Sequence, residues 1–195
     1  MEAKQMEQKG KSVSPFSSES RNAYVIEHLT EAMLTLLAEK PISEITISEL
    51  CDSAGVGRTS FYRNFESKED ILKAHMARLF QGCVAGWDRD HPASFSGVIR
   101  QLFFHFEANR RFYSLIYERG LIDLVKDLFL ETFGFNPAQD LVPAYSSAYV
   151  AFLLYGWVEV WFRRGMKETV AELADCLGKS VDSAMKAQSK RQEQV

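Results

Sequence analysis

The chain has 195 residues, of which 46% are hydrophobic and 12% aromatic, so it can bury a core of ordinary domain size. Its formal net charge is −3, which argues against non-specific nucleic-acid binding by the molecule as a whole. Residues 21–80 hold seven Lys and Arg against nine Asp and Glu, a net charge of −2 over that segment. Any DNA-binding role must therefore depend on where individual basic side chains are placed.

The spacing of the cysteines and histidines predicts neither a metal site nor a cofactor. Cys51, Cys83 and Cys176 are far apart and odd in number, with no CxxC pair, and we expect reduced thiols in a cytoplasmic protein. The four histidines show no ligand spacing. No P-loop, GxGxxG, HExxH or GxSxG motif occurs, so we expect no enzyme and no catalytic residue.

The chain begins with a polar segment, and a long amphipathic helix follows it. Residues 1–18 predict a flexible tail without the apolar run of a signal peptide, and their lysines leave open a basic arm that touches DNA. Residues 21–39 carry one apolar stripe with helical spacing, and Pro41 ends this helix.

Residues 45–66 predict two short helices joined by a tight turn. Thr46 is an N-cap, and Glu49 completes a capping box. Gly55 lies where the chain must turn, and a positive φ there suits glycine. A second helix opens near Gly57 and runs to about Asn64. One face of such a pair holds the two helices together and the other faces outward, an arrangement that is typical of a helix–turn–helix.

The segment resembles the DNA-binding helix–turn–helix of the tetracycline-repressor (TetR) family of bacterial regulators, over roughly residues 21–80. The matching residues are Ile45-Thr46, Leu50, Ala54-Gly55-Val56, Phe61-Tyr62, Asn64-Phe65 and Ser67-Lys68-Glu69-Asp70-Ile71-Leu72. The chain departs from the family at Gly57, where a serine-like N-cap is common. Glycine is tolerated there at a cost of a few tenths of a kcal/mol.

The candidate DNA contacts follow from the second helix and its surroundings. Arginine at position 58 can grip guanine O6 and N7 with two hydrogen bonds. The resemblance implies that Arg58, Thr59 and Ser60 read bases, and that Tyr62 and Lys68 clamp phosphates. The full set of expected DNA-binding residues is Thr46, Arg58, Thr59, Ser60, Tyr62, Arg63, Asn64 and Lys68.

The rest of the chain predicts further helices and no strands. Ser67 and Asp70 form a second capping box at the start of a helix that runs to about Trp87. We expect loops at Asp88–Ser94 and Gly134–Pro143, with three amphipathic helices between them. Thr169 and Glu172 cap a last helix.

Residues 144–164 are apolar almost all round, so this helix must be buried on two sides. Ser146, Ser147 and Glu159 interrupt the run, and we expect no membrane span. A single helix–turn–helix reads too little DNA, and dimers read two half-sites. We therefore expect a homodimer, although ordinary intramolecular packing remains an alternative for each residue. The expected interface residues are Leu154, Trp157, Val158, Trp161, Val170, Leu173, Leu177 and Val181.

Aromatic side chains of the C-terminal part are candidates for an apolar effector pocket, with a filled aromatic core as the alternative. The expected ligand-binding residues are Phe103, Phe106, Phe112, Tyr113, Ile116, Phe129, Tyr145, Tyr149 and Phe152. The resemblance implies that an effector in such a pocket lowers DNA affinity, coupled through the helix at 68–87.

We thus predict an all-α protein of about nine helices with three parts. Residues 1–18 are a tail, 19–66 a three-helix helix–turn–helix domain, and 67–190 an effector-binding and dimerisation domain. The predicted function is a cytoplasmic, homodimeric repressor that binds a pseudo-palindromic double-stranded operator and is released by a small apolar effector. The alternatives are control by a protein partner and, more remotely, an enzyme of another class.

Overall fold

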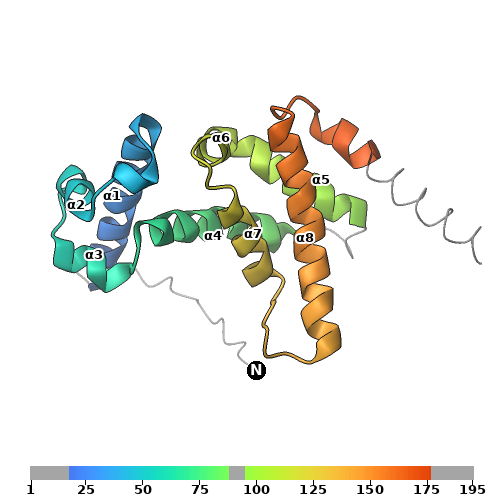
Figure 1. The fold of residues 1–195 in the computed structure, drawn as a ribbon, viewed down its shortest axis with the longest axis horizontal. Helices are drawn as coiled ribbons and strands as arrows, with labels where there is room; N and C mark the ends of the chain where they lie inside the picture. Colours follow the sequence, from blue (N-terminus) through green and yellow to red (C-terminus); the bar gives the residue numbers. More distant parts are fainter. Residues whose placement is uncertain (1–17, 88–94, 177–195) are drawn as a thin grey trace, which may run out of the picture. The chain divides into compact units, whose positions relative to one another are not determined.

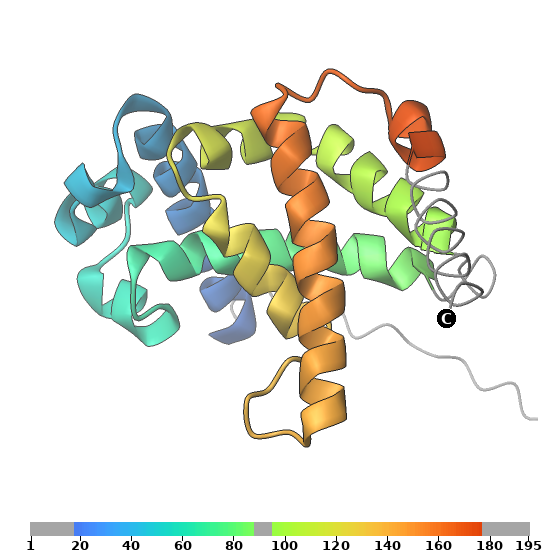
Figure 2. The same cartoon turned by 45° about the vertical axis from the view of Figure 1, so that its right-hand side comes forward.

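The structure is a computed structural model that describes residues 18–87 and 95–176 (Figures 1 and 2). Within those ranges the chain forms helices and turns and no strand, which confirms the all-α class. It divides into two compact units, Met1–Leu72 and Lys73–Val195. The expected tail and the loop at Asp88–Ser94 lie largely or wholly outside the described residues, as do Leu177 and Val181.

The first unit consists of short helices packed on one long helix. Its elements are α1 (Ser18–Glu39), the 3₁₀ turn η1 (Ile42–Glu44), α2 (Ile47–Ala54), α3 (Arg58–Asn64) and the start of α4 (Lys68–Trp87). Helix α1 contacts both α2 and α3. Leu29, Met33 and Leu37 recur every fourth residue on α1 and are fully buried, together with Leu50 of α2 and Phe61 of α3. This core holds the two short helices in place.

The second unit continues with α4 and adds a bundle of helices. Its further elements are α5 (Phe95–Ala108), α6 (Arg110–Glu118), α7 (Asp123–Thr132), α8 (Leu141–Arg163) and a helical segment at 170–176. Helix α8 packs on α7, and its first turns extend past the end of α7 (Figures 1 and 2).

The expected loop at Gly134–Pro143 ends earlier than predicted, because α8 begins at Leu141. Pro143 therefore lies in the first turn of α8 rather than in the loop. A proline is tolerated there because the first backbone N–H groups of a helix have no intrahelical acceptor.

Aromatic rings fill the centre of the second unit. Phe106 lies with its ring centroid 4.3 Å from that of Tyr113 and 6.3 Å from that of Phe129. The His105 Nε2 and the Tyr113 hydroxyl are hydrogen-bonded at 2.7 Å. Burial lowers the pKa of His105 to about 4 and raises that of Tyr113, so both side chains are neutral at pH 7.

The buried His105 makes the stability of the second unit depend on pH. Because its pKa is lowered on folding, the unfolded chain binds the extra proton between about pH 6.5 and pH 4. Stability is therefore full above pH 6.5 and falls toward pH 4, by up to about 3 kcal/mol from this residue. Urea unfolding between pH 7 and pH 4 should show a shallower loss for His105→Gln than for the natural chain. Equal losses would contradict the assignment.

Candidate nucleic-acid interface

The turn between α2 and α3 is set by a cap at each end of α2. The Thr46 Oγ1 accepts a hydrogen bond of 3.1 Å from the backbone N–H of Glu49. At the other end Gly55 has φ +65, and its N–H donates to the Asp52 carbonyl. The N–H of Val56 donates to the Cys51 carbonyl at 3.0 Å. This pair of bonds is a Schellman motif, which reverses the chain within one left-handed residue.

The turn places α3 with one face inward and the other in solvent. Phe61 is fully buried and Phe65 nearly so, which locks α3 onto the first unit. Arg58, Thr59 and Arg63 are exposed, and the Tyr62 side chain is 61% exposed. Arg58 is the first residue of α3, after Gly57, which caps the helix without a side-chain hydrogen bond. Four of the expected DNA contacts thus share the open face of one helix.

The exposed arginines of α3 keep their charge available. Among the described residues, neither the Arg58 nor the Arg63 guanidinium forms an ion pair, because no carboxylate oxygen lies within 4.0 Å of its nitrogen atoms. Glu49 of α2 is paired with Lys40, with 2.6 Å between Oε1 and Nζ. That ammonium holds the pKa of Glu49 below its ordinary value. Because Lys40 lies nine residues from Glu49, no helical spacing in the sequence predicts this pair.

Three of the expected contacts are only partly available to DNA. The Asn64 side chain is half-buried, and its Nδ2 donates to the Ser60 carbonyl at 2.8 Å. Ser60 is half-buried as well. The Thr46 hydroxyl oxygen is exposed but already accepts the cap hydrogen bond. Phosphate contact from Asn64 would need its amide to leave its own helix.

Lys68 has a structural role that the sequence did not predict. Its Nζ donates to the carbonyls of Ile42 and Ile45, both at 2.6 Å. The ammonium therefore ties the first turn of α4 to η1 and to the chain that enters α2. The Ser67–Asp70 capping box, with 2.7 Å from Ser67 N to Asp70 Oδ2, secures the same turn. Contact between Lys68 and a phosphate stays a prediction.

The expected effector and dimer residues are distributed differently from the prediction. Tyr145, Tyr149 and Phe152 are exposed and do not join the buried aromatic cluster of Phe103, Phe106, Tyr113, Ile116 and Phe129; Phe112 is half-buried beside it. Leu154, Val158, Trp161 and Val170 are buried within the chain's own core, so they are not available to a partner. The two faces of α8 are thus reversed relative to the prediction. Both faces are apolar, so periodicity alone did not distinguish them.

Comparison with known proteins agrees with this geometry. Residues 29–75 match the model of the bacterial regulatory proteins of the tetR family. The structure of Lin0861 from Listeria innocua has a TM-score of 0.65 at 15% identity, covering 88% of this chain and 96% of that one. The fatty acid degradation regulator FadR from Bacillus halodurans has a TM-score of 0.48 at 15% identity, covering 80% and 93%. NalD, a secondary repressor of an efflux pump in Pseudomonas aeruginosa, has a TM-score of 0.45 at 17% identity, covering 84% of this chain and 96% of that one.

The turn, the buried phenylalanines and the open polar face of α3 define a helix–turn–helix DNA-binding regulator. Residues 29–75 carry the DNA-binding segment of the TetR family of bacterial regulatory proteins. This is a family of transcriptional regulators rather than of enzymes.

We expect Lys68→Ala to destabilise the first unit by about 2 kcal/mol or more, because two carbonyls lose charged hydrogen bonds. Lys73→Ala is the matched control, since Lys73 makes only a half-exposed ion pair of 3.9 Å with Asp127. Urea unfolding, followed by circular dichroism, measures both changes. Equal stability of the two variants would show that Lys68 does not hold this turn.

Proposed function

We propose that this chain is a homodimeric repressor that reads a pseudo-palindromic operator with α3 and is released by a small effector. The observation that carries the proposal is the exposed polar face of α3, whose two arginines have no carboxylate partner among the described residues. A short helix so presented enters the major groove, and Arg58 at its first turn reaches base edges. The Tyr62 hydroxyl and Arg63 contact phosphates and fix the register.

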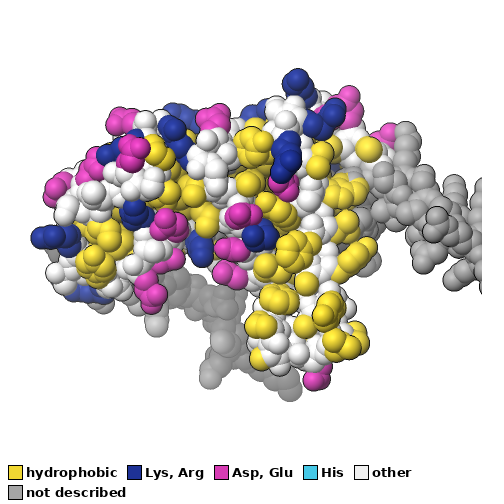
Figure 3. Space-filling model, in the orientation of Figure 1, with side chains coloured by type: hydrophobic (Ala, Val, Ile, Leu, Met, Phe, Trp, Pro, Cys, Tyr) yellow, Lys and Arg dark blue, Asp and Glu magenta, His cyan; other side chains and the backbone are white. Residues whose placement is uncertain are grey.

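Dimer formation is supported by the exposed face of α8. Six of the ten exposed large hydrophobic side chains of the described residues lie on this helix, so the apolar surface is concentrated there. They include Tyr145, Tyr149, Phe152 and Val160, which with Gly156 form one stripe along the helix, the α8 stripe. Figure 3 shows apolar side chains over the lower half of α8. An apolar surface of this kind is typical of an interface.

Gly156 adds a second argument for a partner on the α8 stripe. A Cβ at this position would meet no atom within 4 Å, so packing inside the chain does not require glycine. Glycine within a helix costs about 0.5–1 kcal/mol relative to alanine. Small residues allow two helices to approach closely, and a second copy of α8 crossing here would use that space.

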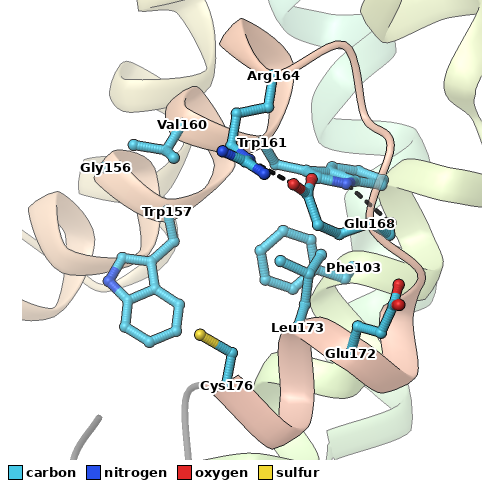
Figure 4. Close-up of a pocket in the computed structure, with 10 residues that line it drawn as sticks. All are labelled: Phe103, Gly156, Trp157, Val160, Trp161, Arg164, Glu168, Glu172, Leu173 and Cys176. Atoms are coloured by element: carbon cyan, nitrogen blue, oxygen red, sulfur yellow. Dashed lines mark hydrogen bonds and ion pairs between the residues drawn. The ribbon is translucent and has the colours of Figure 1, made fainter.

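A groove beside the α8 stripe extends the proposed interface. It has a volume of about 500 Å³ and lies between α8 and the helical segment at 170–176 (Figure 4). Trp157, Val160 and Leu173 contribute to its apolar lining. Arg164 is paired with Glu168 at its edge. Trp157 and Leu173, which the sequence assigned to the interface, thus belong with the α8 stripe in this proposal.

Two alternatives to a dimer surface on α8 follow from its composition. Helix α8 is long and apolar enough to cross a membrane, although core helices of soluble proteins meet the same criterion. A different protein partner, in place of a small effector, would also use an exposed apolar face. We favour a second copy because a single α3 reads one half-site, and two related copies read a palindrome.

We propose that the protein acts in the cytoplasm, where its operator is.

Release by an effector requires two states with different spacing of the two recognition helices. An effector shifts their equilibrium only by its differential affinity for them. Helix α4 spans both units, since the division falls between Leu72 and Lys73. We propose that α4 transmits the change.

We expect Arg58→Ala to weaken specific DNA binding by about 1–3 kcal/mol and to leave binding to random duplex nearly unchanged. Fluorescence anisotropy with DNA from upstream of the protein's own gene, at two salt concentrations, measures both affinities. The matched control is Arg111→Ala, an exposed arginine on α6. Equal loss on both DNAs would assign Arg58 to phosphate contact instead of base reading.

We expect Tyr149→Glu to weaken the dimer by about 2–4 kcal/mol, since it places a charge in the centre of an apolar interface. The control is Tyr24→Glu, which changes an exposed tyrosine of α1 in the same way. Sedimentation equilibrium without detergent measures the mass of each protein. A natural chain that is monomeric, or that needs detergent to stay dispersed, would contradict the proposed interface.

A further inference from the structure

The α8 stripe has its largest side chains toward the start of the helix and its smallest toward the end. Tyr145 and Tyr149 are exposed in the first half of α8. Gly156 and Val160 follow in the second half, with Phe152 between the two pairs. The stripe therefore projects over the first half of the helix and is low over the second half.

The large and small positions of the stripe are related by one point, midway between residues 152 and 153. Tyr149 and Gly156 are equally far from this point along the helix, and so are Tyr145 and Val160. When two copies of a helix pack antiparallel about such a point, each tyrosine of one copy lies opposite the small residue of the other. Packed helices fill the space between them in this way, with large side chains facing small ones. Parallel packing would instead place tyrosine against tyrosine and leave Gly156 facing Gly156.

The groove beside the α8 stripe lies at the small residues. Gly156 and Val160 belong to its lining on α8, and Leu173 lines the wall formed by the segment at 170–176 (Figure 4). The space over Gly156 is open, since a Cβ there would meet no atom within 4 Å. A volume of about 500 Å³ thus adjoins the two positions that antiparallel packing places under the partner's tyrosines.

The charges at the two ends of α8 favour the same orientation. Asp140 precedes the helix, and among the described residues its carboxylate forms no ion pair and no capping hydrogen bond. At the other end Arg163 and Arg164 are paired within the chain, whereas Lys167 forms no ion pair with any described residue. Antiparallel packing brings the start of each helix beside the end of its partner, so Asp140 approaches the side that carries Lys167. The opposite partial charges of the two helix ends add to this attraction.

We propose that two copies of this chain pack α8 against α8 in antiparallel orientation, with the tyrosines of each copy at the groove of the other. Tyr149 of one copy covers Gly156 of the other, and Tyr145 covers Val160. Each copy thus completes the other's groove with its own side chains. The inference rests on the homodimer of the proposed function, to which it adds the orientation and the register of the two helices.

Disulfide cross-linking between two cysteine variants tests the register. The background chain carries Cys83→Ala and Cys176→Ala, because these two thiols are not buried. Tyr149→Cys and Gly156→Cys are introduced into separate full-length chains, which are co-expressed, oxidised and separated on a non-reducing gel. We expect a covalent dimer from the mixture and none from either variant alone. Equivalent positions of the two copies would lie roughly 10 Å apart along the helix, too far for a disulfide.

Further variants control for chance encounters and for folding. Ser146→Cys, at an exposed position of α8 outside the stripe, should give no covalent dimer with Gly156→Cys. Gly156→Leu should weaken the dimer at least about tenfold in sedimentation equilibrium, because the leucine meets Tyr149 of the partner. The unit itself accommodates this leucine, since a Cβ at Gly156 meets no atom within 4 Å. Adding Tyr149→Ala to Gly156→Leu should recover most of the lost affinity, because the leucine then has room.

The outcomes separate this inference from the proposed function. Covalent dimers from Tyr149→Cys alone or from Gly156→Cys alone would show parallel helices, which overturns the inference while the homodimer stands. A natural chain that sediments as a dimer but gives no covalent product in the mixture would also overturn it, since the partner then occupies another surface. A natural chain that is monomeric would refute the homodimer of the proposed function itself.

Discussion

The left-handed conformation of Gly55 determines the angle between α2 and α3, and the DNA-binding surface depends on that angle. With φ at +65 and the Schellman hydrogen bonds in place, the chain reverses at this one left-handed residue. Phe61 and Phe65 then meet the core, and Arg58 and Tyr62 must face solvent because they lie on the opposite side of the same short helix. The Lys68 ammonium supports this arrangement from α4 by binding the carbonyls of Ile42 and Ile45.

In the second unit the corresponding constraint is that α8 has two apolar faces. One face, with Leu154, Val158 and Trp161, is buried in the unit, and the α8 stripe remains exposed. In the proposed dimer a second copy covers this surface and relieves the free-energy cost of exposing it, so the stability of the unit would depend on dimer formation.

Local patterns predicted the elements of the fold well. The caps at Thr46, Ser67 and Thr169 form the hydrogen bonds expected of them, because each depends on residues three apart in the chain. The start of α8 was placed too late, since Pro143 resembles a loop residue but is accepted in a first helical turn. The same local rules gave no account of Lys40 with Glu49, or of Lys68 with two distant carbonyls.

The sequence by itself determined the helix–turn–helix, because its caps, its glycine turn and its inward phenylalanines are all set within about twenty residues. It also determined that α8 would be apolar on two sides. Only the tertiary structure decided which of those sides is buried, because the choice depends on how α8 packs against α7 and the aromatic core.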